Sequence, residues 1–455
     1  PPFLASHATP KTLLILSKDH TLFTGAYDEY SDIDGDGVID TDYNPDPDVR
    51  YGGYFNTDVC YSYGSGKFTP SANATADKAC DGTGEWSGDF LNYLTMSRMD
   101  LIRRGLYGGS RSTDSSSATV LERAFIPADS HAWGHSYSSE ATDGYDISQF
   151  SPLSSPSSGQ RHLLASLSTG TSPSPGDPIL RVREDTSSTI ADWLNGAVPV
   201  AQSGVGDGTY SDYTVRAEVC VEGFLESNCR LYPGTDGTRG TDDDVYKPQG
   251  ILQNYGISGR VEFGLMTGSY IQPDDGGILR VEIGDISSEV DSTTGQLNDA
   301  VQGIISTVDT LQILDFDGSG YSPEDRNVGN PVAEMLYEGI RYLQGAGSPT
   351  SNFVQDLSGS DDLLLDIPAL TNWNDPLPSG TPWCTDTSIV LISGDEVSYD
   401  GDASFSDISE INTLLNTISS EEGIESSVLT GGEGFCNATQ ISGLGSIEGV
   451  CLENP

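Results

Sequence analysis

The chain has 455 residues, long enough for two or three ordinary domains or for one domain with large insertions. It carries 68 Asp and Glu against 21 Lys and Arg, and the net charge of −47 is spread along the chain. Because such a surface repels other polyanions, the composition excludes electrostatic binding to nucleic acid or to an anionic membrane. It also predicts that divalent cations or high salt surround the protein, since either relieves repulsion among its own carboxylates, and extracellular calcium is the leading candidate.

Neither a membrane span nor a signal peptide is visible. No apolar run reaches the length needed to cross a bilayer, and the first residues lack the basic and apolar regions of a signal peptide. We therefore expect the numbering to begin after processing.

The seven cysteines indicate disulfides, because none has the Cys-x-x-Cys spacing of zinc, redox or haem sites. Local spacing predicts three bonds that each close a short loop: Cys60 with Cys80, Cys220 with Cys229, and Cys436 with Cys451. A loop of ~15 residues contributes about 3 kcal/mol in the chain-entropy model. Cys384 is left over. Disulfides favour an oxidising, extracellular setting over the alternative of reduced cytoplasmic thiols.

The first predicted element is a strand at residues 13–16, where four large apolar residues follow a Pro-rich start. An unbroken apolar run of this length is typical of a strand buried on both faces, in the middle of a sheet. Ser17, Asp19 and Thr21 follow it at alternate positions. Their oxygens are spaced to ligate a hard cation, but only one carries a charge, so a polar loop is the favoured interpretation.

An Asp-rich segment follows, with Asp32, Asp34, Asp36 and Asp40 around Gly37 and Val38. In this spacing a tight turn directs alternate carboxylates, and the Val38 carbonyl, at one point. The alternative is a solvated turn, but the clustered carboxylates repel one another unless a cation lies between them. We therefore predict a structural calcium site. Tyr43 stands where a cytosolic calcium sensor would have a bidentate Glu.

Residues 86–107 have the apolar stripe of one helix, which ends at Gly108-Gly109. Residues 108–257 are rich in Ser, Gly and Pro and predict a long loop-rich insertion containing one strand at 213–221. His131 and His135 lie four apart in this insertion. Without a Glu beside the first they form no metalloprotease motif, and we expect surface or capping histidines.

From about residue 258 the pattern alternates between strands and helices. We predict strands at 260–267, 277–283 and 388–393, and helices at 297–311, 331–343 and 407–418. A second calcium-loop pattern lies between them, with Asp315, Asp317 and Ser319 as side-chain ligands and Tyr321 as a carbonyl ligand. It lacks a Glu at the twelfth position, so an ion and an empty turn remain equally open.

Several long sequence blocks together resemble the amino-terminal half of the PilY family, large secreted adhesins associated with the tip of bacterial type IV pili. They are Gly53-Tyr-Phe55 to Cys60-Tyr-Ser-Tyr63, residues 86–96, 215–220 and 263–270, and Asn330 to Glu338. The order of strands and helices also resembles a von Willebrand factor A domain. The resemblance implies an α/β fold with a Rossmann-type central sheet flanked by helices, from residues 11–21, 86–107 and 258–455, and with two large loop-rich insertions at 22–85 and 108–257.

The resemblance also implies a metal-ion-dependent adhesion site, from which this sequence departs. Ser17, Asp19 and Thr21 replace the family's D-x-S-x-S motif, Asn330 occupies the position of a Thr, and Asp395 follows Gly394 where the family has Asp-Gly. Mg²⁺ needs near-octahedral oxygen geometry, so these changes make Mg²⁺ binding unlikely here and predict a degenerate, empty site. Nothing in the chain resembles the family's carboxy-terminal β-propeller, and we expect a processed fragment or a shortened relative.

These observations favour a non-enzymatic, extracellular adhesion protein, associated with the pilus or cell surface and stabilised by calcium. We expect pilins or other surface proteins as partners, a host or surface ligand, and self-association. The alternative is a structural subunit of an extracellular filament or sheath. We expect no enzymatic activity, because the sequence shows no nucleophile elbow, phosphate-binding Gly loop or zinc motif.

Overall fold

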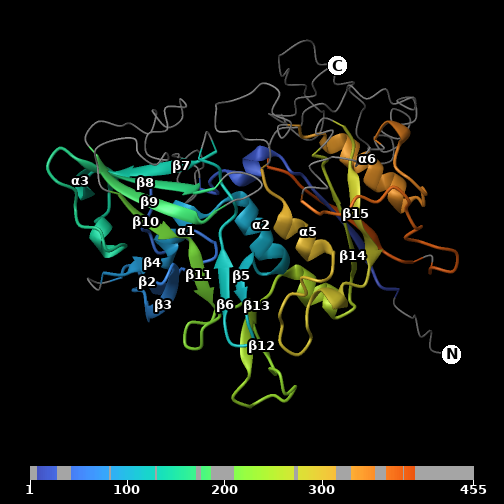
Figure 1. Cartoon of the computed structure of the whole chain (residues 1–455), viewed down its shortest axis with the longest axis horizontal. Coiled ribbons are helices and arrows are strands. Elements are labelled where there is room, and N and C mark those ends of the chain that lie inside the picture. The colour runs from blue at the N-terminus through green and yellow to red at the C-terminus, as the bar shows by residue number, and fades with distance from the viewer. Residues whose placement is uncertain are drawn as a thin grey trace, which may run out of the picture.

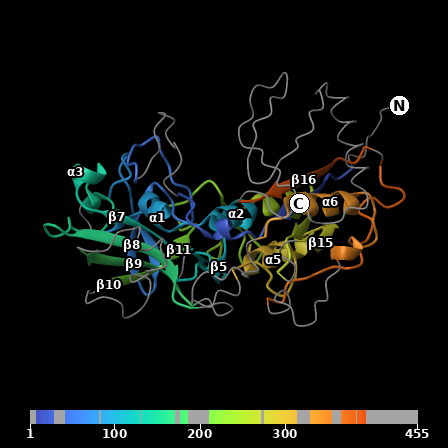
Figure 2. The same ribbon diagram turned by 90° about the horizontal axis from the view of Figure 1, so that it is seen from above.

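The computed structural model describes residues 8–27, 42–80, 84–128, 131–170, 176–185, 210–270, 275–313, 329–353, 365–382 and 384–394. These residues form an elongated mixed α/β molecule with several sheets and few helices (Figure 1). In the view of Figure 2 a sheet around β14 and β15 lies at one end and an antiparallel sheet, β7 to β10, lies at the other. Among the described helices none is long and apolar enough to cross a membrane.

The sheet at the first end has the order β15-β14-β1-β16. One of its two inner strands is β1 (Lys11–Leu16), which pairs in parallel with β14 (Glu262–Thr267) and with β16 (Thr387–Ile392). The antiparallel strand β15 (Ile278–Gly284) forms the far edge. Residues 13–16 are at most 1% exposed, which confirms the prediction of a buried strand in mid-sheet.

The apolar run at 388–393 also predicts a buried strand, and this prediction is wrong. β16 is an edge strand of this sheet within the described residues, and all its positions are exposed or half-buried, with Val390 43% exposed. A run of apolar residues therefore identified the strand but not its position, because edge and central strands can share the same composition.

Helices cover both faces of the sheet. Leu13 and Ile15 pack in one apolar cluster with Met335 and Tyr342 of α6 (Val332–Leu343). Leu14 and Leu16, which point the other way because side chains alternate along a strand, pack in a second cluster. That cluster includes residues of α2 (Arg98–Tyr107) and α5 (Ile304–Thr310). The sheet thus has a helical layer on each side.

Helix α6 confirms the helix predicted at 331–343, and it lies very close to the sheet. A Cβ atom at Gly339 would lie 2.8 Å from Cδ1 of Ile15. The helix predicted at 297–311 is much shorter, since α5 begins only after Gly303. Glu289 explains this start: its carboxylate accepts the N–H groups of Ile304 and Ile305 at 3.0 and 2.8 Å. Burial raises the pKa of Glu289, and these two hydrogen bonds oppose that rise.

The single helix predicted at 86–107 is also wrong. The segment forms a short strand, β4 (Trp86–Ser87), then α1 (Gly88–Thr95), and then α2 after a break at Met96 and Ser97. Ser97 caps α2 in a capping box with Asp100, whose Oδ2 accepts from the Ser97 N–H at 2.9 Å and from its hydroxyl at 2.6 Å. Helices α1 and α2 therefore belong to different apolar clusters.

Strands from both predicted insertions join in one six-stranded sheet of order β4-β2-β3-β11-β6-β5. The first insertion supplies β2 (Val59–Gly64) and β3 (Lys67–Asn73). The second supplies β5 (Arg111–Asp114), β6 (Thr119–Glu122) and β11 (Arg216–Val219). The two insertions are thus one structural unit, although the predicted division of the chain into domains remains untested.

The second insertion is far richer in strands than its composition predicted. It also contains the sheet β10-β9-β8-β7 and the pair β12-β13. The strand predicted at 213–221 is split at Val215 between two sheets. The prediction that His131 and His135 lie at the surface is wrong, because each is 7% exposed and His135 lies in β7. The remaining elements are β7 (Trp133–Tyr137), β8 (Arg161–Ser168), β9 (Pro178–Asp185), β10 (Tyr210–Thr214), β12 (Cys229–Tyr232), β13 (Val245–Pro248), α3 (Glu140–Asp143), η1 (His20–Phe23), η2 (Ile147–Gln149), η3 (Leu252–Ile257), η4 (Ser287–Glu289) and η5 (Ser351–Phe353).

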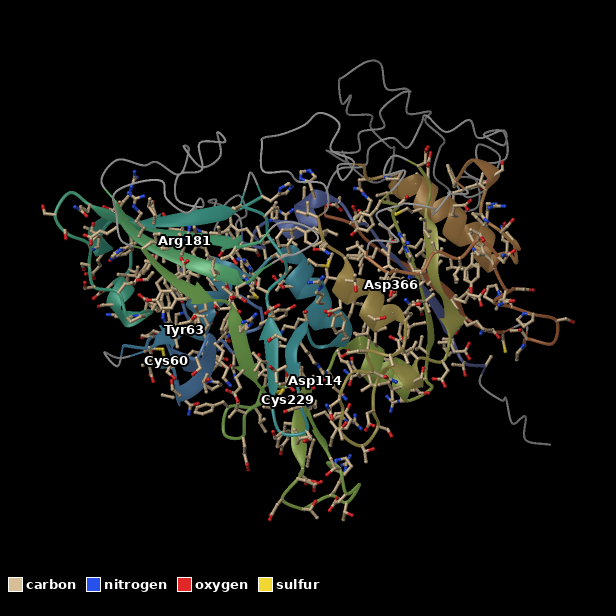
Figure 3. The ribbon with its side chains drawn as sticks, viewed as in Figure 1. Cys60, Tyr63, Asp114, Arg181, Cys229 and Asp366 are labelled. Carbon is tan, nitrogen blue, oxygen red and sulfur yellow. A yellow bond between two sulfur atoms is a disulfide. The ribbon has the colours of Figure 1, made fainter. Side chains whose placement is uncertain are left out.

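Two of the three predicted disulfides form. Cys60 bonds to Cys80 beside β2, and Cys220 bonds to Cys229 at the start of β12 (Figure 3). Cys384 is an exposed free thiol. The predicted Cys436–Cys451 bond and the helix at 407–418 lie outside the described residues.

We predict that Asp100→Ala lowers the free energy of unfolding by roughly 3 kcal/mol. The substitution removes the α2 cap and the acceptor at 2.8 Å from the Ala124 N–H, so buried donors lose their partners. Urea titration measures the change as a lower midpoint at constant slope. Asp58→Ala is the control, because Asp58 is 66% exposed and pairs only with surface Arg50. Equal effects of the two substitutions would contradict the structural role of Asp100.

Candidate functional site

Polar side chains from three distant segments meet where β1 and β16 end and α6 begins. Ser17 follows β1, Ser393 follows β16, and Asn330 lies two residues before α6. The Ser17 hydroxyl donates to Oδ1 of Asn330 at 2.8 Å, and Nδ2 of Asn330 donates to the Ser393 hydroxyl at 2.9 Å. In parallel sheets the carboxyl ends of the strands are the usual place for ligand sites.

Asp19 is the carboxylate of this cluster and is fully buried. Its Oδ1 accepts the Thr21 hydroxyl at 2.5 Å, and its Oδ2 accepts the Gly394 N–H at 3.1 Å. Its own N–H donates to the Ser17 hydroxyl at 3.0 Å. Ser17, Asp19, Thr21 and Asn330, all predicted site residues, are therefore brought together, whereas Asp395 lies outside the described residues.

Apart from Asp19, all the side chains of this cluster are uncharged. Hydroxyl and amide oxygens are weak ligands for a divalent cation, and both carboxylate oxygens of Asp19 are already hydrogen-bonded. A cation would have to replace these bonds. The described residues therefore fit a hydrogen-bonded connection between β1, β16 and α6 better than a magnesium site.

Ser393 is the member of the cluster that the sequence analysis missed. A usable signal existed, because β1 and β16 pair in parallel with Leu16 opposite Ile392, so the residues that follow each strand are neighbours. Ser17 and Ser393 hold equivalent positions after the two strands. The pairing of the strands, however, is not readable from the local sequence.

Both predicted calcium loops, Asp32 to Asp40 and Asp315 to Tyr321, lie outside the described residues and remain predictions. Within the part of the chain that the structure describes, no group of three or more His, Cys, Asp or Glu is arranged to hold a metal ion.

Tyr43, the twelfth position of the first calcium-loop pattern, is described and is a core residue. It is 2% exposed, and its hydroxyl donates to Oδ2 of Asp89 at 3.0 Å. Asp89 is also paired with the buried Nζ of Lys78 at 3.3 Å. Burial raises the pKa of Asp89, and the charge of Lys78 opposes that rise.

Comparison with known proteins identifies the family. Residues 40–181 match the small alpha/beta domain of PilY1 homologs, and residues 263–455 match their second domain. The chain belongs to the PilY1 homolog family. Both matched regions include strands described above, β2 to β8 in the first and β14 to β16 in the second.

Two relatives, both from Xylella fastidiosa (strain Temecula1), are called type IV pilus biogenesis factor PilY1 homologs. One is 37% identical over 432 residues, covering 85% of this chain and 28% of the relative. The other is 26% identical over 404 residues, covering 77% of this chain and 30% of the relative. The chain thus spans less than a third of the length of these relatives. No solved structure matches it.

We predict that Asn330→Ala destabilises the fold by about 1–3 kcal/mol, because the buried Ser17 hydroxyl loses its acceptor and the Ser393 hydroxyl its donor. Thermal unfolding measures the effect as a lower Tm. Asn298→Ala is the matched control, since Asn298 is exposed and its side chain donates to the Ser288 carbonyl at the surface. An unchanged Tm for Asn330→Ala would show that the cluster does not hold the three segments together.

Proposed function

We propose that this protein acts outside the cell as a non-enzymatic adhesion component of type IV pili, with pilins or other surface proteins as partners. The observation that carries the proposal is the 37% identity to a relative named as a type IV pilus biogenesis factor. The two disulfides support an oxidising compartment, since such bonds persist outside the cytoplasm.

The four-stranded sheet supports a von Willebrand factor A-like fold at the centre of this function. In such a fold a buried parallel strand lies in mid-sheet, helices cover both faces, and the ligand site lies at the carboxyl ends of the strands. β1, the helices α2 and α6, and the cluster around Asp19 have this arrangement. We infer that the site descends from a metal-dependent adhesion site and now acts as a connection without Mg²⁺.

Calcium is part of the proposal because of the charge. A net charge of −47 makes the folded state repel itself, and bound divalent cations would reduce that cost. Tyr43, three residues after Asp40, has its side chain fixed in the core. We propose that Ca²⁺ at Asp32 to Asp40 stabilises the unit formed by the two insertions.

The first test locates the protein in cells that produce it. Epitope-tagged protein should be released with pili when cells are sheared, and sheared fractions from a strain without pilin should lack it. Recovery of the protein only in the cytoplasm, or at the same level in the sheared fraction without pilin, would contradict the proposal. Self-assembly of the purified chain without pilins would instead favour the alternative, a filament or sheath subunit.

The calcium test measures Tm with calcium and with chelator. We predict a lower Tm in chelator, because a ligand that binds the native state stabilises it in proportion to the logarithm of its excess over the Kd. Asp34→Ala with Asp36→Ala should remove most of this response. Asp285→Ala with Asp299→Ala is the matched control, as it deletes two exposed carboxylates that belong to neither predicted calcium loop. An identical Tm in calcium and in chelator would refute calcium stabilisation.

A further inference from the structure

A pocket of about 460 Å³ lies beside β12. It is lined by β12, the loop that follows β12, the π-helical turn η3 with the residues on either side of it, and the loop at 290–292. π-helical turns are rare and occur often at functional sites. The pocket is separate from the cluster around Asp19, because the two share no residue.

Three arginines from three of these segments line the pocket: Arg230, Arg239 and Arg260. None of their guanidinium groups makes an ion pair or a side-chain hydrogen bond with the part of the chain that the structure describes. Carboxylates that could pair with them are abundant, since the chain has 68 acidic residues against 21 basic ones. Elsewhere arginines such as Arg181 and Arg216 are paired with carboxylates.

Hydrogen bonds hold two side chains in the inner wall of the pocket. The Gln249 side chain donates to the Tyr232 hydroxyl, and Nε2 of Gln253 donates to the Tyr107 carbonyl at 2.7 Å. Both glutamine side chains are buried. This part of the wall is therefore in place before a ligand binds, which lowers the cost of binding.

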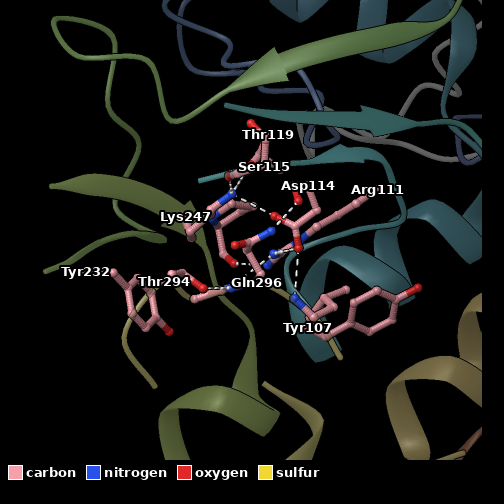
Figure 4. Close-up of polar contacts among 12 residues, drawn as sticks. Tyr107, Arg111, Asp114, Ser115, Thr119, Tyr232, Lys247, Thr294 and Gln296 are labelled. Carbon is pink, nitrogen blue, oxygen red and sulfur yellow. Dashed lines mark hydrogen bonds and ion pairs between the residues drawn. The ribbon is translucent and has the colours of Figure 1, made fainter. Parts of the chain in front are cut away.

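The loop at 290–297 is held against this wall by a buried polar network (Figure 4). Asp114 accepts the Leu297 N–H at 2.8 Å, and its own carbonyl accepts Nε2 of Gln296 at 2.6 Å. Lys247, fully buried, pairs with Asp114 at 2.6 Å. At Gly295 the φ angle is +69°, and a Cβ there would lie 2.5 Å from the Tyr232 ring, so only glycine allows this close approach.

Two further residues of the lining, Asp291 and Tyr255, offer an acceptor and an exposed aromatic ring. Asp291 is exposed, and hydrogen bonds from the N–H groups of Thr294 and Thr293 lower its pKa, so it is ionised at neutral pH. Tyr255 is 47% exposed. The pocket therefore offers arginine guanidinium groups to an anion, the Asp291 carboxylate as an acceptor for hydroxyl groups, and the Tyr255 ring as a flat surface for stacking.

We propose that this pocket binds an acidic polysaccharide, with sugar carboxylates held by Arg230, Arg239 and Arg260, hydroxyl groups donating to Asp291, and a sugar ring packed on Tyr255. Arg recognises carboxylates through paired N–H donors, which makes it suited to such a ligand. An acidic peptide would supply carboxylates but fewer hydroxyl donors for Asp291. The proposal does not depend on the pilus assignment, because it concerns a separate pocket and is tested with purified protein.

The test measures binding of the purified chain to oligogalacturonate by calorimetry at 0.15 M salt, where charges more than about 8 Å apart are screened. Chelator is present throughout, so that calcium cannot bridge the polysaccharide to protein carboxylates. We expect saturable binding of oligogalacturonate and none of neutral dextran. The triple variant Arg230→Ala, Arg239→Ala, Arg260→Ala should bind at least tenfold more weakly, about 1.4 kcal/mol.

Matched single variants separate a pocket from general surface charge. Arg239→Ala should weaken binding, whereas Arg50→Ala should not, although Arg50 is also exposed and carries the same charge. Equal Tm values for all variants show that they fold. The proposal is overturned if the parent chain does not bind oligogalacturonate, if the triple variant binds it equally well, or if polyglutamate binds as tightly.

Discussion

The pairing of β1 with β14 and β16 is the constraint on which the rest of the structure depends. It joins residues 11–16 to residues 262–267 and 387–392, and an ion pair between Lys11 and Glu262 lies at its first step. Closing so long a loop costs only modestly more than closing a short one, because the entropy penalty grows with the logarithm of loop length. The pairing is then stabilised by complete burial of residues 13–16 under helices on both faces.

The segments that leave β1 and return at β14 have to bury their own apolar surface. They do so in a second core rich in aromatic rings, where Tyr43, Phe90 and Phe150 contact one another edge to face or tilted. Asp100 joins α2 to the segment that follows β6. It completes the capping box with Ser97 at the start of α2, and it accepts the Ala124 N–H. Ala124 packs in the same cluster as α2, so this buried carboxylate fixes the chain after β6 against the core under β1.

Features with a local signature were predictable from the sequence. Residues 13–16 are a strand because four large apolar residues stand together, α6 has an apolar stripe, and each observed disulfide closes a loop short enough to be read from spacing. The break between α1 and α2 also had a signal, the Ser97-x-x-Asp100 capping box, but the apolar stripe on either side of it favoured one helix. The pairing of β3 with β11 had no signal in the local sequence, since the single bridge between Phe68 and Ala217 depends on the tertiary fold.

In the candidate site, too, some residues could be identified from the sequence and others only from the fold. The resemblance named Ser17, Asp19, Thr21 and Asn330, and these residues meet, but Ser393 was missed because its place depends on the parallel pairing of β16. The arginine pocket was invisible to sequence reasoning, as Arg230, Arg239 and Arg260 come from separate segments and no spacing connects them.

The net negative charge of the chain bears directly on how the arginine pocket is interpreted. In a protein of net charge −47 an unpaired arginine has many carboxylates within reach along the chain, and pairing at the surface needs little more than proximity. Three arginines around one pocket form no ion pair with the described residues, although Arg239 shares its loop with Asp236 and Asp243. The acidic surface around the pocket would repel a polyanion at long range, so an acidic polysaccharide would have to be held by short, paired hydrogen bonds from the guanidinium groups.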